Sequence, residues 1–280
     1  MAVTLPFRCL EPFGVEIDFD LSQPLAPSLA YHFRQLWAEH GLVLARGQSL
    51  TMERQRELCA LLGPILVREG EGETMTNAGG GPSASPLAWH SDAAYTDHPF
   101  DAIALHALDV VNDASSTRFV SAEVALPADL REALEGREQE MISPHYTQLA
   151  GRTCDQREPE AMKRGVRPTV LENPHNGRPC LWVSELQTAR VLDMGWEESR
   201  DLLHAAFDRL YTPERVFEHK WRTGDVIFWD NIALQHARGN LESVGTRVLQ
   251  RVIVGVEGVA PHVAGEANPS SRRSLGSFSS

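Results

Sequence analysis

The chain has 280 residues, of which 42% are hydrophobic and 23% are charged, so it is long enough and apolar enough to bury a full globular core. A formal net charge of -12, a pI near 5.4 and the lack of a local run of lysine and arginine argue against nucleic acid as a partner. No apolar stretch approaches membrane-spanning length, and residues 1–14 contain no long apolar segment, so we expect no membrane contact and a cytoplasmic location.

Hydrophobic periodicity predicts short strands and two helices in the first third of the chain. Apolar residues recur at helical spacing up to His40, where Ser28 is placed to cap the start of the helix and Gly41 its end. Residues 68–88 show no periodicity and form either a functional lid or a disordered loop. The expected elements are a strand at 13–21, a helix at 28–40, a strand at 42–45 and a helix at 51–62.

Short strands dominate the rest of the chain. An apolar stripe predicts a helix at 196–211, and a first-turn proline predicts a short helix at 127–134. The polar segment 151–167 is expected to be a mobile insertion, and the turn-rich residues 173–178 are expected to connect a hairpin. The expected strands lie at 102–111, 115–120, 169–171, 180–184, 226–229 and 248–256.

This order of elements predicts a mostly β protein with flanking helices and an antiparallel core, rather than a parallel βαβ sheet. No repeat and no clear linker divides the chain, so we expect one domain over residues 1–260. The Ser- and Pro-rich residues 261–280 are expected to form a disordered tail. The cysteines include no Cys-x-x-Cys pair, which argues against a thiolate zinc site and a disulfide framework; they are Cys9, Cys59, Cys154 and Cys180.

The tetrapeptide Trp89-His90-Ser91-Asp92 opens a stretch that the pattern predicts as a strand. Because alternate residues of an extended backbone point to the same face, His90 and Asp92 can both bind one metal ion. Alone, a His-x-Asp tripeptide is weak evidence, since a strand histidine is more often a packed residue than a ligand.

A second polar stretch near the other end of the chain supplies a third ligand. His236 follows Trp229-Asp230-Asn231, and Arg247 and Arg251 come after it. Two histidines and one carboxylate on one face of an ion suit non-haem ferrous iron, because three positions stay open for other ligands. An arginine can bind a carboxylate through two parallel hydrogen bonds, so Arg247 is a candidate clamp for an acidic cosubstrate.

Over residues 14–255 the sequence resembles the taurine dioxygenase / 2,4-D dioxygenase family of iron(II)- and 2-oxoglutarate-dependent oxygenases. In that family a Trp-Asp-Asn triplet precedes the distal histidine by five residues, and arginines follow this histidine at eleven and fifteen. Asn231, His236, Arg247 and Arg251 reproduce these spacings. The resemblance implies a double-stranded β-helix (jelly-roll) core, with His90, Asp92 and His236 as the iron ligands.

The resemblance also implies roles for further residues. Thr117 stands twenty-seven residues after His90, where the family has a threonine that helps to hold 2-oxoglutarate, although Ser115-Ser116 replaces the usual Gly-Asp before it. Arg247 is expected to bind the same cosubstrate. For Arg251 two roles remain open, namely binding an anionic group of the substrate and forming a salt bridge beneath the site.

The implied reaction is hydroxylation of a C–H bond in a small organic substrate, with dioxygen consumed and 2-oxoglutarate decarboxylated to succinate. An organic acid and a natural-product intermediate are the substrate classes considered; Pro86, where taurine dioxygenase has an asparagine, argues against taurine itself. The family implies a homo-oligomer. The alternatives are a non-catalytic jelly-roll protein that binds a metal or small ligand, and a zinc hydrolase with the same three ligands.

The remaining polar and aromatic residues near these motifs are expected to have structural roles. Asp230 and Asn231 are expected to brace the turn before His236, a supporting role rather than a ligand role. Trp89 and Tyr95 are expected to pack in the core or a loop. Four other histidines are expected in loops or at the surface, and these are His145, His175, His204 and His219.

Overall fold

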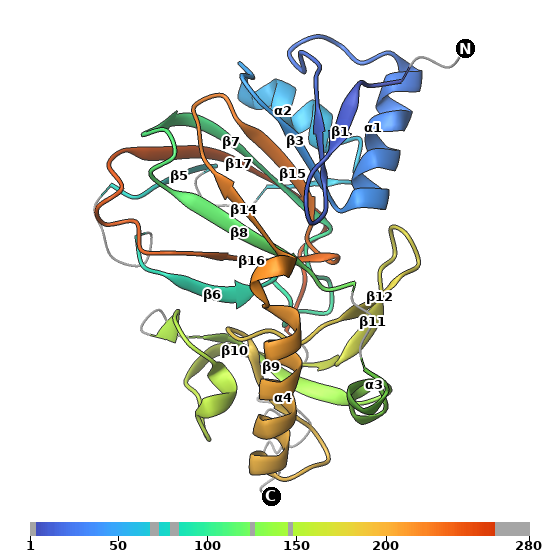
Figure 1. Ribbon diagram of the computed structural model, residues 1–280, viewed down its shortest axis with the longest axis vertical. Coiled ribbons are helices and arrows are strands. Elements are labelled where there is room, and N and C mark those ends of the chain that lie inside the picture. Colours follow the sequence, from blue (N-terminus) through green and yellow to red (C-terminus); the bar gives the residue numbers. More distant parts are fainter. Residues whose placement is uncertain (1–3, 68–72, 79–83, 124–126, 145–147, 261–280) are drawn as a thin grey trace, which may run out of the picture.

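The computed structural model describes residues 4–67, 73–78, 84–123, 127–144 and 148–260. Two β-sheets face each other, with two N-terminal helices outside one sheet and a further layer of strands and a long helix beyond the other (Figure 1). The expected mostly β architecture with a jelly-roll core is therefore confirmed. The expected tail at 261–280 and His145 lie outside the described residues.

The large sheet is antiparallel except where β2 pairs with β3. β5 (Thr74–Thr76) pairs with β17 beside the main path. The order along that path is β1 (Phe7–Cys9), β2 (Val15–Ile17), β3 (Leu42–Ala45), β15 (Val226–Asp230), β7 (Ala102–Val110), β17 (Arg247–Val254) and β4 (Ile65–Leu66).

The small sheet joins segments that are far apart in sequence, in the order β14 (Val216–Lys220), β8 (Ser116–Ser121), β16 (Leu234–Arg238) and β6 (Leu87–His90). Its β6–β16 pair places His90 directly opposite His236. The topology therefore brings the two polar stretches of the sequence together.

Both faces of the large sheet are buried, which explains its continuous apolar runs. In β15, Val226 and Phe228 pack with the N-terminal helices, while Ile227 and Trp229 face the small sheet. The same alternation holds in β3, β7 and β17. Burial on two sides gives the sheet a rigid inner face.

The two helices that cover the outer face of the large sheet are α1 (Pro27–His40) and α2 (Met52–Cys59). The expected Ser28 cap is wrong, because Pro27 occupies the first turn and Ala26 precedes the helix without a side-chain cap. Gly41 ends α1 in the left-handed conformation, as expected. Thr51 caps α2 through the Arg54 amide, but α2 stops at Cys59, before the expected end at 62.

The third layer contradicts the expected mobile insertion at 151–167. Most of that segment is η3 (Thr153–Asp155) and β10 (Ala161–Pro168), and β10 pairs along its length with β9 (Glu138–Pro144). β10 escaped detection because its alternation is weak, with mostly half-buried or exposed side chains. β13 (Thr188–Val191) completes this three-stranded sheet.

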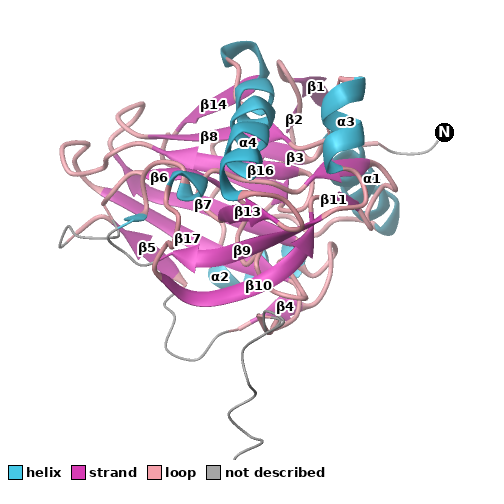
Figure 2. Cartoon of the chain, turned by 90° about the horizontal axis from the view of Figure 1, so that it is seen from below, coloured by secondary structure: helices cyan, strands magenta, loops and turns pink. Residues whose placement is uncertain are grey.

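The helix α4 (Trp196–Leu210) buries its apolar stripe against this layer, as expected (Figure 2). The short α3 (Ala128–Leu134) is also as expected, except that Pro127 precedes the helix instead of lying in its first turn. The expected hairpin is formed by β11 (Val170–Glu172) and β12 (Pro179–Leu181), and η4 (Pro213–Arg215) leads into β14. None of the described helices is long and apolar enough to cross a membrane.

Candidate metal centre

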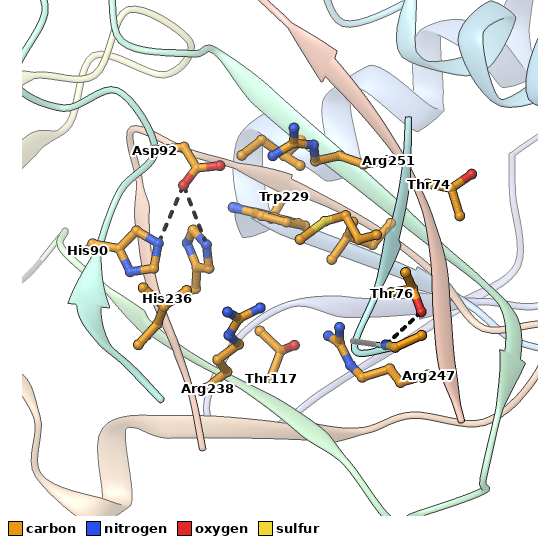
Figure 3. Close-up of a pocket in the computed structure, with 15 residues that line it drawn as sticks. Thr74, Thr76, His90, Asp92, Thr117, Trp229, His236, Arg238, Arg247 and Arg251 are labelled. Atoms are coloured by element: carbon orange, nitrogen blue, oxygen red, sulfur yellow. Dashed lines mark hydrogen bonds and ion pairs between the residues drawn. The ribbon is translucent and has the colours of Figure 1, made fainter. Parts of the chain in front are cut away.

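A cavity of about 530 Å³ lies between the large and small sheets. Figure 3 shows that polar side chains from both sheets point into it. It is lined by Thr74, Met75, Thr76, Ala78, Leu87, His90, Asp92, Ile103, Leu105, Thr117, Trp229, His236, Arg238, Arg247 and Arg251. All six sequence-predicted site residues are in this set, so the structure brings all of them to one cavity.

His90, Asp92 and His236 converge at one wall of the cavity (Figure 3). One Asp92 carboxylate oxygen, Oδ1, lies 3.4 Å from Nε2 of His90 and 3.9 Å from Nε2 of His236. The two imidazole centroids are 4.1 Å apart. The three ligand atoms all lie within 4.8 Å of one another, which is close enough for a single ion to contact each.

Trp89 and His90 lie in β6, as expected of a strand, but the strand ends at His90 and Asp92 lies in the turn that follows it. The next residue, Ala93, has a left-handed backbone with φ of 57°, which an alanine rarely adopts. Asn231 holds the turn from both sides: its Oδ1 accepts a hydrogen bond from the Asp92 amide, and its Nδ2 donates to the Asp92 carbonyl. This bracket fixes the carboxylate beside the two histidines.

The protonation of the three side chains suits a divalent metal. The Nδ1 of His90 donates a hydrogen bond to the Ala88 carbonyl at 2.8 Å, which leaves its Nε2 lone pair directed at the cavity. Burial, and then the neighbouring His90, lower the pKa of His236 to about 3, so this imidazole is neutral at physiological pH. Burial opposes ionisation of Asp92, but the adjacent imidazoles of His90 and His236 and the charge of Arg251 hold its pKa below the usual range.

One feature departs from the usual surroundings of a metal-binding histidine. The Nδ1 of His236 is buried and has no hydrogen-bond partner among the described residues, whereas such a nitrogen normally donates to a carbonyl or carboxylate. Its ring is held instead by aromatic contacts with Trp229 and Phe119. Packing, rather than a hydrogen bond, sets the orientation of this imidazole.

Asp230 braces the turn before His236, as expected. Its Oδ1 accepts hydrogen bonds from the amides of Ile232 and Ala233, and its Oδ2 accepts from Nδ1 of His175 at 2.8 Å. Asn173 of the hairpin also donates to Oδ2 at 2.9 Å. The fully buried carboxylate thus ties the β11–β12 hairpin to the strand that carries His236.

One of the histidines expected in loops or at the surface is buried in a strand instead. His219, on β14 and 1% exposed, lies 3.1 Å from an oxygen of Asp225. His175 lies in the turn between β11 and β12, as expected, but it is only partly exposed, packs against Trp37 and lies between Asp230 and Asp101. His219 was misassigned because a buried histidine beside a carboxylate leaves no hydrophobic pattern in the sequence.

The cavity contains an arginine that the sequence analysis did not single out. Arg238 projects into it from β16, two residues after His236 (Figure 3). Its position was available from the sequence, because alternate strand residues share a face. Arg238 was not predicted because the family motif includes only Arg247 and Arg251 after the distal histidine.

Arg247 is only 3% exposed, and its Nε has no hydrogen-bond partner among the described residues. Burial, and then the positive charge of Arg238, lower the pKa of Arg247 to about 10, so the guanidinium still carries its charge at neutral pH. Thr117 lies nearby on β8, and its hydroxyl oxygen accepts a 3.0 Å hydrogen bond from the Trp221 indole. The Thr117 hydroxyl proton therefore points to another acceptor.

A second cluster of potential ligands, Cys154, Asp155 and His204, lies at the edge of the third layer. Burial, and then the charge of Asp155, raise the pKa of the Cys154 thiol to about 12. A thiol that keeps its proton is a poor metal ligand, so this cluster does not compete with the cavity. Cys59 and Cys180 are also buried, as expected for small core residues, whereas Cys9 is exposed.

A jelly roll with two histidines and an aspartate at the mouth of an arginine-lined cavity belongs to the class of metal-dependent oxygenase folds. Residues 6–253 match the family described as "Taurine catabolism dioxygenase TauD, TfdA family". The chain therefore belongs to this dioxygenase family, and the expected family is confirmed.

Individual relatives agree with this assignment. The chain is 26% identical over 278 residues to the alpha-ketoglutarate-dependent 2,4-dichlorophenoxyacetate dioxygenase of Cupriavidus pinatubonensis, a match that covers 89% of this chain and 96% of the relative. It is 30% identical to pentalenolactone F synthase of Streptomyces arenae over 37% of this chain, and it spans only 34% of that protein's length. The crystal structure of a taurine dioxygenase from Burkholderia xenovorans has the same fold, with a TM-score of 0.74, 23% identity and coverage of 92% and 93% of the two chains.

Proposed function

We propose that this protein is an Fe(II)- and 2-oxoglutarate-dependent oxygenase that hydroxylates a C–H bond of a small organic acid and converts 2-oxoglutarate to succinate. The observation that carries the proposal is the pairing of two features in one cavity. Three potential metal-ligand atoms lie within 4.8 Å of one another, and the buried guanidinium of Arg247, whose Nε has no partner among the described residues, lines the same cavity.

In this proposal His90, Asp92 and His236 hold the iron, which supplies the activation of dioxygen when it is bound. Three protein ligands leave room for a 2-oxo acid, bound through two atoms, and for dioxygen. The zinc-hydrolase alternative is disfavoured, because Asp92 is the only carboxylate among the described cavity residues, and no second one stands ready as a general base.

Arg247 and Thr117 are proposed to bind the distal carboxylate of the cosubstrate. A buried guanidinium whose Nε has no hydrogen-bond partner among the described residues is costly, and an incoming carboxylate would reduce that cost. The Thr117 hydroxyl oxygen already accepts from Trp221, and its proton can donate to the same carboxylate. Together the two side chains would hold the end of 2-oxoglutarate that points away from the metal.

The substrate is proposed to be a monoanionic acid with an apolar body. Arg251 lies on the Asp92 side of the cavity, away from Arg247, and can bind an anionic group there (Figure 3). The remaining lining is largely apolar, with Met75, Leu87 and Ile103 among its side chains. A relative named for 2,4-dichlorophenoxyacetate supports an acid of this kind.

The test is succinate release with Fe(II) and 2-oxoglutarate across a panel of aryloxy acids, sulfonates, amino-acid derivatives and terpenoid acids. Wild-type protein should release succinate with at least one carboxylic acid, and Asp92→Ala should abolish the release. Arg251→Leu should lower kcat/KM for that acid by about 10- to 100-fold, the size expected for loss of one charge-assisted hydrogen-bond pair.

Two results would contradict the proposal. Undiminished succinate release by Asp92→Ala would mean that the metal is held elsewhere. Tight binding of metal and 2-oxoglutarate without oxygen uptake for any member of the panel would favour the non-catalytic ligand-binding alternative.

A further inference from the structure

Arg238 occupies a definite place between the metal ligands and Arg247. Along β16 its side chain shares a face with His236, while Gln235 and Ala237 point away: Gln235 bonds to Tyr211, and Ala237 packs with Trp89. The Nε of Arg238 donates to the Ser85 carbonyl at 3.2 Å, which fixes the plane of the guanidinium. Its terminal nitrogens point toward the cavity interior, next to Thr117 (Figure 3).

The described residues that line the cavity carry more positive than negative charge. Arg238, Arg247 and Arg251 line it, and Asp92 is the only carboxylate among its described lining residues. The charge of Arg238 is one cause of the lowered pKa of Arg247, whereas the charge of Asp92 favours the charged form of Arg238. An anion placed between a buried and a half-buried guanidinium would offset their mutual repulsion.

The arginines divide into two groups along the cavity. Arg251 lies near Asp92, whereas Arg238 and Arg247 lie on the side of Thr117 (Figure 3). A 2-oxo acid bound to a metal at His236 and reaching toward Arg247 would carry its distal carboxylate into the second group. We propose that Arg238 is a cosubstrate-binding residue that, with Arg247 and Thr117, forms a three-sided clamp on the distal carboxylate of 2-oxoglutarate.

This inference rests on the proposed function. It adds that Arg238 helps to determine which 2-oxo acid the protein binds as cosubstrate. Two guanidinium groups on one carboxylate favour a dicarboxylic 2-oxo acid over a monocarboxylic acid with the same metal-binding head. 2-Oxovalerate is such a monocarboxylic acid, since it keeps the 2-oxo acid head and lacks the distal carboxylate. Comparing the two acids isolates the contacts made to the distal carboxylate.

The test is calorimetric titration of Mn(II)-loaded protein with 2-oxoglutarate and with 2-oxovalerate, which reports binding without turnover. Arg238→Gln should raise the Kd for 2-oxoglutarate by about 10- to 100-fold and leave the Kd for 2-oxovalerate within about twofold. Arg238→Lys, which keeps the charge and loses the fork, should raise the Kd for 2-oxoglutarate by a smaller factor, roughly 3- to 10-fold. Melting temperatures establish that the variants are folded.

Arg118→Gln is the matched control, because Arg118 lies on neighbouring β8 opposite Ala237, on the outer face of the sheet. It removes the same charge outside the cavity and should change neither Kd. Equal weakening of both acids by Arg238→Gln would overturn the inference, as would no weakening of either. Failure of the wild-type protein to bind 2-oxoglutarate would instead overturn the proposed function, and the inference with it.

Discussion

Asn231 shows how a residue that touches no ligand can set the geometry of the site. It holds the backbone of Asp92 by a donated and an accepted hydrogen bond, each 2.9 Å long, and also donates to the Phe100 carbonyl at 3.0 Å. The strained Ala93 backbone follows immediately. Asn231 was expected to brace the turn before His236, but its side chain holds the turn of Asp92 instead, a partner that the sequence motif does not reveal.

Asn231→Ala leaves these buried backbone groups of Asp92 and Phe100 without partners. We expect the free energy of unfolding to fall by roughly 2–3 kcal/mol and metal affinity to fall by about 10- to 100-fold. Urea denaturation and Mn(II) titration measure the two effects. Asn240→Ala, at an exposed position beyond β16, is the control and should change neither; equal behaviour of the two variants would show that Asn231 does not position Asp92.

At the scale of elements, His175 attaches the β11–β12 hairpin to Asp230 at the end of β15, just before the turn that leads into the strand of His236. Burial alone would lower the pKa of this imidazole, but the hydrogen bonds and charges of Asp101 and Asp230 outweigh it and raise the pKa to about 9. The folded pKa therefore lies above the ordinary histidine value of about 6.5. The resulting stability is fully present below pH 6.5 and is lost as the pH rises through 9.

We expect this one group to contribute up to about 3 kcal/mol to the free energy of unfolding at pH 6. Urea denaturation at pH 6.0, 8.0 and 9.5 measures the free energy of unfolding of the wild type and of His175→Gln. The wild type should be much more stable than the variant at pH 6.0, and the difference in unfolding free energy should be smaller at pH 9.5. His204→Gln removes a more exposed ion pair with Asp155 and is the control, with little change at any pH. If the loss of unfolding free energy in His175→Gln does not vary with pH, the charge of His175 does not stabilise the contact with Asp101 and Asp230.

The sequence allowed elements to be predicted where burial leaves a strong pattern and not elsewhere. α4 and β15 bury a regular apolar face and were found close to their observed bounds. β10 has mostly half-buried or exposed side chains and was mistaken for part of a mobile insertion. β6 and β16 are short, and their interior side chains include the polar site residues, so hydrophobic alternation could not reveal them.

At the scale of the whole molecule, the site depends on strand pairing between distant segments. β6 and β16 are adjacent in the small sheet, while Arg247 and Arg251 reach the cavity from β17 in the large sheet. No local pattern predicts that meeting, and only the family spacing of the motifs did. Arg238 was missed for the same reason, because its importance lies in a cavity that spacing alone does not describe.

The central claim, that this cavity binds iron and 2-oxoglutarate together, is tested most directly by anaerobic absorption spectroscopy. Adding 2-oxoglutarate to protein loaded with Fe(II) should produce a weak visible charge-transfer band, because the 2-oxo acid binds the metal through two oxygen atoms. His236→Ala, which removes one metal ligand, should not produce the band. A wild-type protein shown to hold stoichiometric iron, yet giving no band with saturating 2-oxoglutarate, would contradict the account.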